Sequence, residues 1–188
     1  MDTPALLIID MVKDNFDPQK PLPITPFAQA VIEPINTLAA FFRENTWPVV
    51  FATDAFNAGD FIFKGRMQPH SLAGTPGAEI VESLVREATD YWLPKPRFSA
   101  FFNTGLDQWL RARRVDLCAV CGIATNFCVL TTVMDALCHD FKAVFVADAC
   151  AAATAELHQA TLSLYRRNPL YPLLQVMTAA ELTNALKG

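Results

Sequence analysis

Short runs of consecutive apolar residues alternate along the chain with segments in which apolar residues recur at helical spacing. The apolar runs lie at residues 5–10, 47–53, 90–95, 115–121, 141–148 and 173–177. A continuous run is typical of a strand that is buried on both faces, as in a parallel sheet. Strands that alternate with helices predict a Rossmann-like α/β fold, with three α/β/α layers and a central, mostly parallel six-stranded sheet of order 3-2-1-4-5-6.

Helix signals fill the segments between these runs. Thr25 and Pro26 form a typical helix start, and Pro34 should kink the helix that follows to about residue 42. Further helices are expected over 74–87, 104–113, 125–140 and 154–167, and from residue 178 onward. Residues 55–75 show little periodicity, and so long a connection in a compact domain is usually functional or mobile.

The composition narrows the class of protein. The 188 residues are expected to form one domain, residues 1–188. Apolar residues make up 52% of the chain and charged residues 18%, which favours a well-buried sheet and a homo-oligomer, a dimer or a tetramer. The net charge of −4 argues against nucleic acid or an anionic membrane as a partner. An odd number of cysteines and the lack of a signal-peptide pattern fit the reducing cytoplasm.

Three reactive side chains lie at or just after the ends of predicted strands. Asp10 ends the first apolar run, Lys95 ends the third, and Cys128 lies in the first turn of the helix that follows residues 115–121. A buried acid is costly without a partner, and a helix N-terminus favours a thiolate over a thiol. In the expected order the first and fourth strands are neighbours. Asp10 and Cys128 should therefore meet at the carboxyl ends of the strands, where such sheets bind ligands.

Each of these residues also has a purely structural explanation. Asp10 could cap a helix or turn, Lys95 could be a solvated loop lysine, and Cys128 could be a small core residue. Cys118 and Cys121 spell a CxxC motif, but residues three apart in a strand face opposite sides, so both are expected in the core. A catalytic role therefore depends on whether the fold brings Asp10, Lys95 and Cys128 together.

The motifs around these residues are specific when they are taken jointly. They read LIIDMVKDNF at residues 7–16, KPRFSAF at 95–101 and GIATNFCV at 122–129. With these motifs the chain resembles the isochorismatase-like cysteine hydrolases, a superfamily that includes nicotinamidases and N-carbamoylsarcosine amidase. The segment PHSLAGTPGAE at residues 69–79 also resembles the nicotinamidases, so the resemblance covers nearly the whole chain.

The resemblance implies a covalent mechanism. Asp10 would take the proton of Cys128, whose thiolate would attack an amide carbonyl and form a thioester that water then hydrolyses. Lys95 would hold both groups in register and favour their charged forms. The resemblance also implies an oxyanion hole of the backbone N–H groups of Ala124 and Cys128, and a cis peptide between Ile123 and Ala124. Four further residues are candidates for the substrate pocket: Phe16, Phe56, Asn126 and Phe127.

The similarity to metal-dependent nicotinamidases breaks at one position. Those enzymes bind a divalent metal through an Asp-x-His pair after the second strand and through a later histidine, which correspond here to Asp54, Phe56 and His70. A phenyl ring cannot ligate a metal, and two protein ligands rarely make a stable site. We therefore expect that no cofactor is required, that Phe56 disfavours zinc, and that His70 makes hydrogen bonds within its loop.

The leading hypothesis is a cytoplasmic cysteine hydrolase that cleaves a C–N amide bond of a small metabolite. The alternatives are a metal-assisted nicotinamidase with altered ligands, an isochorismate-type hydrolase of a vinyl ether, and a binding module without activity. The loop over residues 55–75 is unusually apolar, and it is expected to form either a lid over the site or a subunit interface.

Overall fold

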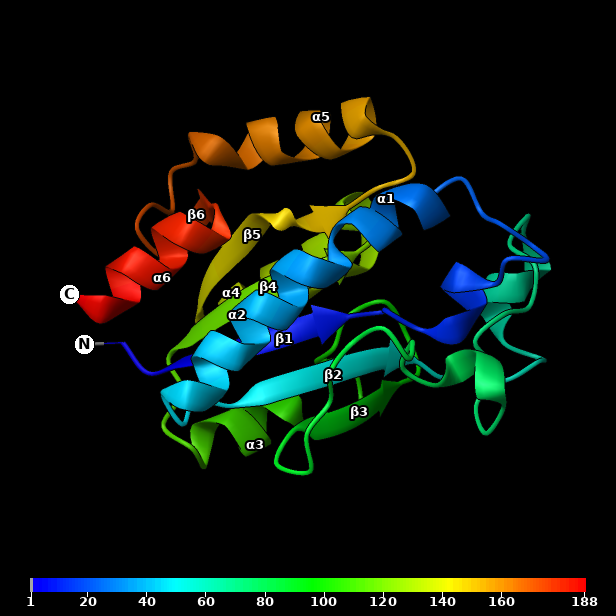
Figure 1. Cartoon of the computed structure of the whole chain (residues 1–188), viewed down its shortest axis with the longest axis horizontal. Helices are drawn as coiled ribbons and strands as arrows, with labels where there is room; N and C mark the ends of the chain where they lie inside the picture. Colours follow the sequence, from blue (N-terminus) through cyan, green and yellow to red (C-terminus); the bar gives the residue numbers. More distant parts are fainter. Residues whose placement is uncertain (1) are drawn as a thin grey trace.

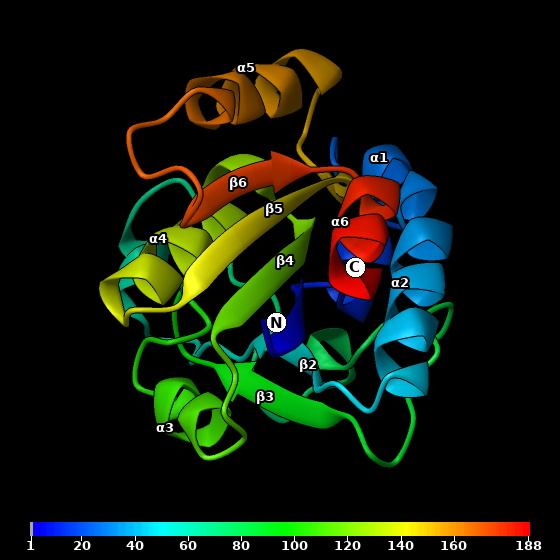
Figure 2. The same cartoon turned by 90° about the vertical axis from the view of Figure 1, so that its left-hand side faces the viewer.

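A single six-stranded sheet with helices on both faces forms the centre of the computed structural model, which describes residues 2–188 (Figure 1 and Figure 2). Neighbouring strands are all parallel, and their order is β3-β2-β1-β4-β5-β6. The predicted fold class and strand order are thus confirmed. The strands are β1 (Pro4–Ile9), β2 (Val49–Asp54), β3 (Tyr91–Lys95), β4 (Leu117–Ile123), β5 (Lys142–Ala151) and β6 (Leu174–Met177).

Helices cover the two faces of the sheet (Figure 2). One face carries α1 (Thr25–Ala30), α2 (Ile32–Glu44) and α6 (Ala179–Lys187), and the other carries α3 (Leu106–Arg111) and α4 (Leu130–Cys138). The helix α5 (Ala155–Arg166) packs against β5 and β6. No helix among residues 2–188 is long and apolar enough to cross a membrane.

The predicted helix over residues 25–42 is divided at Val31 into α1 and α2. This division places Pro34 in the first turn of α2. A missing N–H costs no helical hydrogen bond there, because the first N–H groups of a helix have no partner within it. Instead of the kink that was expected at Pro34, the chain has a break between α1 and α2 at Val31.

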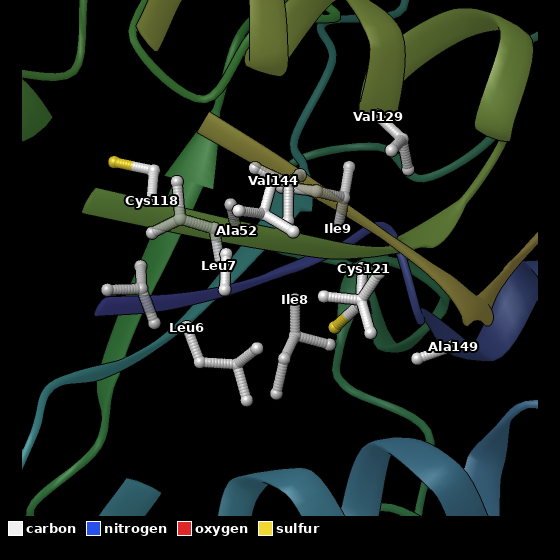
Figure 3. Close-up of a cluster of buried hydrophobic side chains, with 14 of the residues drawn as sticks. Leu6, Leu7, Ile8, Ile9, Ala52, Cys118, Cys121, Val129, Val144 and Ala149 are labelled. Carbon is white, nitrogen blue, oxygen red and sulfur yellow. The ribbon is translucent and has the colours of Figure 1, made fainter. Parts of the chain in front are cut away.

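The core is centred on β1 and β4, whose residues are all buried (Figure 3). Cys118 and Cys121 lie on opposite faces of β4, as predicted, and both are buried. Gly122 allows the two strands to meet closely, because a Cβ atom at this position would lie 2.2 Å from the Ile9 carbonyl oxygen. Its φ of +102° also favours glycine. This close contact lies immediately before Asp10.

Residues 74–87 do not form the predicted helix. Only Pro76–Ala78 is helical, as a short 3-10 turn, and it is followed by a bridge at Ile80 and a turn at residues 82–83. Ile80 forms an antiparallel bridge with Val12, and the Val81 N–H donates to the Met11 carbonyl oxygen at 3.0 Å. Pairing with the chain just after β1 therefore overrides the local helical spacing, and it fixes the two loops beside each other.

Candidate active site

The carboxyl ends of β1, β3 and β4 bring Asp10, Lys95 and Cys128 into one buried site. It lies at the end of the sheet where the loops after β1 and β2 gather, on the right in Figure 1. The Lys95 ammonium donates a 2.9 Å hydrogen bond to Oδ2 of Asp10, and Lys95 is fully buried. The Cys128 sulfur lies within 4.8 Å of a carboxylate oxygen of Asp10. The fold thus joins the three side chains that the sequence singled out.

Asp10 is held by both its backbone and its side chain. Its φ of 54° lies in the left-handed region, which a residue other than glycine adopts only when its surroundings hold it there. The Asp54 N–H donates to Oδ1 of Asp10 at 2.8 Å, and Asn15 Nδ2 donates to the Asp10 carbonyl oxygen at 2.9 Å. These contacts aim the carboxylate at the interior and leave it little freedom.

Asp54 supplies a second carboxylate to this site, a role that the sequence analysis did not predict. Its Oδ1 accepts a short hydrogen bond from Lys95, whose ammonium also donates to the Arg97 carbonyl oxygen at 3.1 Å. The three N–H bonds of the ammonium are therefore all used, on Asp10, Asp54 and Arg97. Asp54 and Lys95 are direct partners in the register of β2 and β3, which is why they meet.

Burial is the largest single influence on the pKa values of Asp54, Lys95 and Cys128. It raises the pKa of Asp54 to about 8, and the charge of Asp10 adds to this shift. Burial alone would lower the pKa of Lys95, but the carboxylates of Asp10 and Asp54 and the nearby Cys128 outweigh it, so the pKa is raised and the lysine stays charged. The site therefore holds a permanent cation between two acids.

The pKa of Cys128 corrects one expectation. The helix N-terminus was expected to favour a thiolate, but burial, followed by the charge of Asp10, raises the pKa of Cys128 well above its ordinary value. Lys95 opposes this shift without cancelling it. The resting side chain is therefore a thiol, and its activation requires a base.

The turn that presents Cys128 is a π-helix over Thr125–Val129, which continues into α4. The Ile123–Ala124 peptide bond that precedes it is cis. Thr125 is fully buried, and its hydroxyl lies 2.8 Å from Nδ1 of His158 on α5. The Val129 N–H donates to the Ala124 carbonyl oxygen at 3.2 Å. The turn is thus held both by its own backbone and by a neighbouring helix.

A cavity of about 160 Å³ opens beside Asp10 and Cys128. Of the four predicted pocket residues it is lined by Phe56 and Phe127, but not by Phe16 or Asn126; Phe16 packs against the core. Phe127 is 47% exposed and stands edge-on to Phe98, with ring centroids 4.9 Å apart. The lining that the sequence did not predict is Asn15, Ile24, Met67 and Phe98, and it also includes Asp54, His70, Ile123 and Ala124.

Comparison with known proteins assigns this architecture to a family. Residues 4–181 match the family model described as an isochorismatase domain. The chain belongs to the isochorismatase family. It is similar to the N-carbamoylsarcosine amidase of Thermoplasma acidophilum, at 30% identity and a TM-score of 0.81, over 96% of this chain and 98% of that one.

Two further relatives of this isochorismatase-family protein are named as a pyrazinamidase and as a probable inactive nicotinamidase. The pyrazinamidase of Pyrococcus horikoshii, solved in complex with zinc, is 25% identical with a TM-score of 0.80, over 94% of this chain and 99% of that one. The probable inactive nicotinamidase At3g16190 of Arabidopsis thaliana is 43% identical over 93 residues, which are 48% of this chain and 47% of that protein.

The positions that correspond to metal ligands in nicotinamidases make other contacts in this family member. Asp54 faces Lys95, and the buried Phe56 ring packs edge-on against Phe63 and His70, at centroid distances of 5.6 and 5.5 Å. Nδ1 of His70 lies 2.9 Å from the Gln68 carbonyl oxygen. One carboxylate that already has a cation, one phenyl ring and one histidine do not fit the ligand set of a divalent metal.

A second possible metal position lies within the catalytic cluster itself. Asp10, Asp54 and Cys128 are close enough to share an ion, with ligand atoms within 4.8 Å of one another. The Lys95 ammonium, however, already contacts both carboxylates. A metal ion there would face a buried positive charge, so the cluster fits an ammonium better than a metal.

Proposed function

We propose that this protein of the isochorismatase hydrolase family cleaves the C–N bond of a small amide, with Cys128 as the nucleophile and without a metal. The observation that carries the proposal is the buried contact between Asp10 and Lys95 beside a thiol that needs a base. The relatives named amidase and pyrazinamidase support the choice of an amide as the substrate.

In the first half of the reaction, the Asp10 carboxylate takes the Sγ proton of Cys128. The thiolate forms a bond to the amide carbon while the carbonyl π electrons move to oxygen. The backbone N–H groups of Ala124 and Cys128 stabilise that oxyanion. When the C=O bond forms again, the C–N bond breaks, the amine leaves with the proton from Asp10, and an acyl thioester remains on Cys128.

In the second half, Asp10 acts as the base again and takes a proton from water. The hydroxide adds to the thioester carbon, and the C–S bond breaks as the carboxylic acid forms. The proton returns from Asp10 to the Cys128 sulfur, which restores the resting thiol. Lys95 remains charged throughout, and it stabilises the anionic Asp10 and the transient thiolate.

Particular residues argue against two other reactions. A metal-assisted nicotinamidase would need ligands at positions 54, 56 and 70, where the contacts of Asp54, Phe56 and His70 do not fit a metal. An isochorismate-type vinyl ether hydrolase does not need a thiol, so it leaves the buried Cys128 beside Asp10 without a role.

Ammonia release by protein treated with a chelator tests the proposal. The panel is nicotinamide, pyrazinamide, N-carbamoyl compounds, maleamate and ureido acids, each assayed with and without added zinc. From the carboxamides we expect ammonia and carboxylic acid in equal amounts, and from the N-carbamoyl and ureido compounds ammonia and carbon dioxide in equal amounts, with rates that zinc leaves unchanged. Release that depends on zinc would favour the metal-assisted reaction. Cleavage of isochorismate without any amide cleavage would favour the ether hydrolase, and silence on all substrates would favour a binding module.

A homo-oligomer and a cytoplasmic location remain predictions. The surface of α5 and of the loop after it carries exposed apolar side chains, with Leu164 and Tyr171 each 72% exposed. Exposed apolar side chains of this size favour association between copies. Light scattering of the purified protein would measure its mass in solution, and we expect at least a dimer.

A further inference from the structure

Most of the wall of the cavity beside Cys128 is apolar. The cavity volume of about 160 Å³ has room for a group about the size of a benzene ring, since a closed apolar cavity of roughly 150 Å³ holds one, and this cavity is open to solvent on one side. A group of that size would contact aromatic and aliphatic side chains on most sides. These walls are Ile24, Phe56, Met67, Phe98, Ile123 and Phe127.

Two acidic side chains line the cavity, and burial raises the pKa of Asp54 to about 8, so Asp54 is mostly uncharged below that pH. Asp10 and Asp54 are the lining carboxylates, and no lysine or arginine lines the cavity among residues 2–188. Lys95 lies behind them, fully buried, with its three N–H bonds already used. A substrate carboxylate would therefore lose its hydration and approach a site that contains acids but offers no free cation.

Arg97, the arginine nearest in sequence to Lys95, does not supply a cation to the cavity. Arg97 pairs with Asp60 at 3.1 Å and also donates to the Pro96 carbonyl oxygen. It does not line the cavity.

Two further polar side chains line the wall, Asn15 and His70. Nδ2 of Asn15 donates to the Asp10 carbonyl oxygen. Nδ1 of His70 contacts the Gln68 carbonyl oxygen, and its ring packs against Phe56. Neither Asn15 nor His70 has the guanidinium group by which proteins commonly recognise a carboxylate in a bidentate manner.

We infer that the substrate is a small amide whose acyl group is uncharged and apolar, about the size of a benzene ring, and that acidic amides are excluded. This inference rests on the proposed function and adds the substrate class to it. Phe56 has a direct part in this selection, because its ring forms an apolar wall where a metal ligand would offer a polar contact.

A pair of substrates of matched shape tests the inference through turnover. Maleamate and (Z)-but-2-enamide differ in a carboxylate that is replaced by a methyl group, and benzamide provides the aromatic case. We expect kcat/KM to favour (Z)-but-2-enamide over maleamate by at least about tenfold. Equal or faster turnover of maleamate would overturn the inference while leaving the amidase proposal intact.

Substitution of Phe127 adds a test that requires a gain of function. Phe127 lines the cavity and is half-exposed, so Phe127→Arg places a cation at the wall with little effect on the core. The preference for the neutral amide should fall at least about tenfold in Phe127→Arg, because the arginine can pair with maleamate. Phe127→Met, the uncharged control, should keep the wild-type preference. An unchanged preference in Phe127→Arg would contradict the electrostatic basis of the selection.

Binding to Cys128→Ala separates the substrate class from the reaction. This variant lacks the nucleophile, so isothermal titration calorimetry can compare benzamide, (Z)-but-2-enamide and maleamate without turnover. We expect the neutral amides to bind and maleamate to bind at least about tenfold more weakly. If wild type hydrolyses no amide but this preference holds, the proposed function fails and the preference of the cavity for uncharged apolar groups stands. Preference for maleamate, or no binding of either neutral amide, would overturn the substrate class.

Discussion

The backbone N–H of Asp54 donates a 2.8 Å hydrogen bond to Oδ1 of Asp10, across the adjacent ends of β2 and β1. The side chain of the same Asp54 contacts Lys95, which in turn donates to Oδ2 of Asp10. Asp54 thus helps to position Asp10, the proposed base, in two ways: directly through its backbone N–H and indirectly through Lys95. Substitution of its side chain leaves the backbone contact in place and tests the second route alone.

Asp54→Asn should change how stability depends on pH. Burial raises the pKa of Asp54 to about 8, whereas an unfolded aspartate titrates near pH 4. Between these values the folded chain holds a proton that the unfolded chain has lost, so the free energy of unfolding falls as pH rises, by at most about 1.4 kcal/mol per unit. Urea unfolding at pH 5 and pH 8 should show a larger loss for wild type than for Asp54→Asn. Equal losses would contradict the assigned shift.

Lys95→Met should be strongly destabilising and inactive. It leaves Asp10 and Asp54 buried without their cation, and breaking a buried ion pair from one side costs about 3–5 kcal/mol. Denaturant unfolding should show this loss. The double variant with Asp54→Asn should recover part of the stability but none of the activity, because Cys128 still lacks the stabilising charge. A stable and active Lys95→Met would remove the lysine from the proposed mechanism.

Gly122→Ala should prevent the normal contact between β1 and β4. The added Cβ would lie 2.2 Å from the Ile9 carbonyl oxygen, and the φ of +102° is unfavourable for alanine. We expect a loss of more than about 3 kcal/mol, or no folded protein, since neither backbone can move aside. Gly59→Ala is the matched control, because no atom lies within 4 Å of its new Cβ. Similar thermal midpoints for the two variants would contradict the close contact.

Much of the fold could be predicted because its signals are local. Continuous apolar runs mark strands such as Ala5–Ile9, which are buried on both faces, and alternation with helices leads to a parallel sheet. The strand order then places the end of β1 beside the end of β4. Asp10 and Cys128 were therefore expected to meet before any coordinates were known, and they do.

The features that could not be predicted depend on partners distant in the chain. The segment at Ile80 has helical spacing, but it is not helical because Ile80 pairs with Val12, 68 positions earlier in the sequence. The Asp54 carboxylate contacts Lys95 because β2 and β3 are in a register that the sequence does not specify. Likewise Ile24 lines the cavity from a loop that carries no motif that would indicate this role.

The most direct test of the central claim is to replace two cysteines in parallel and measure ammonia release from the best substrate of the amide panel. Cys128 is the buried thiol beside Asp10, whereas Cys138 is exposed at the end of α4 and serves as the control. We predict that Cys128→Ala lowers kcat by at least about a thousandfold, since loss of a nucleophile removes most of the chemical step, and that Cys138→Ala leaves kcat unchanged. A Cys128→Ala protein that retains wild-type turnover would contradict the account.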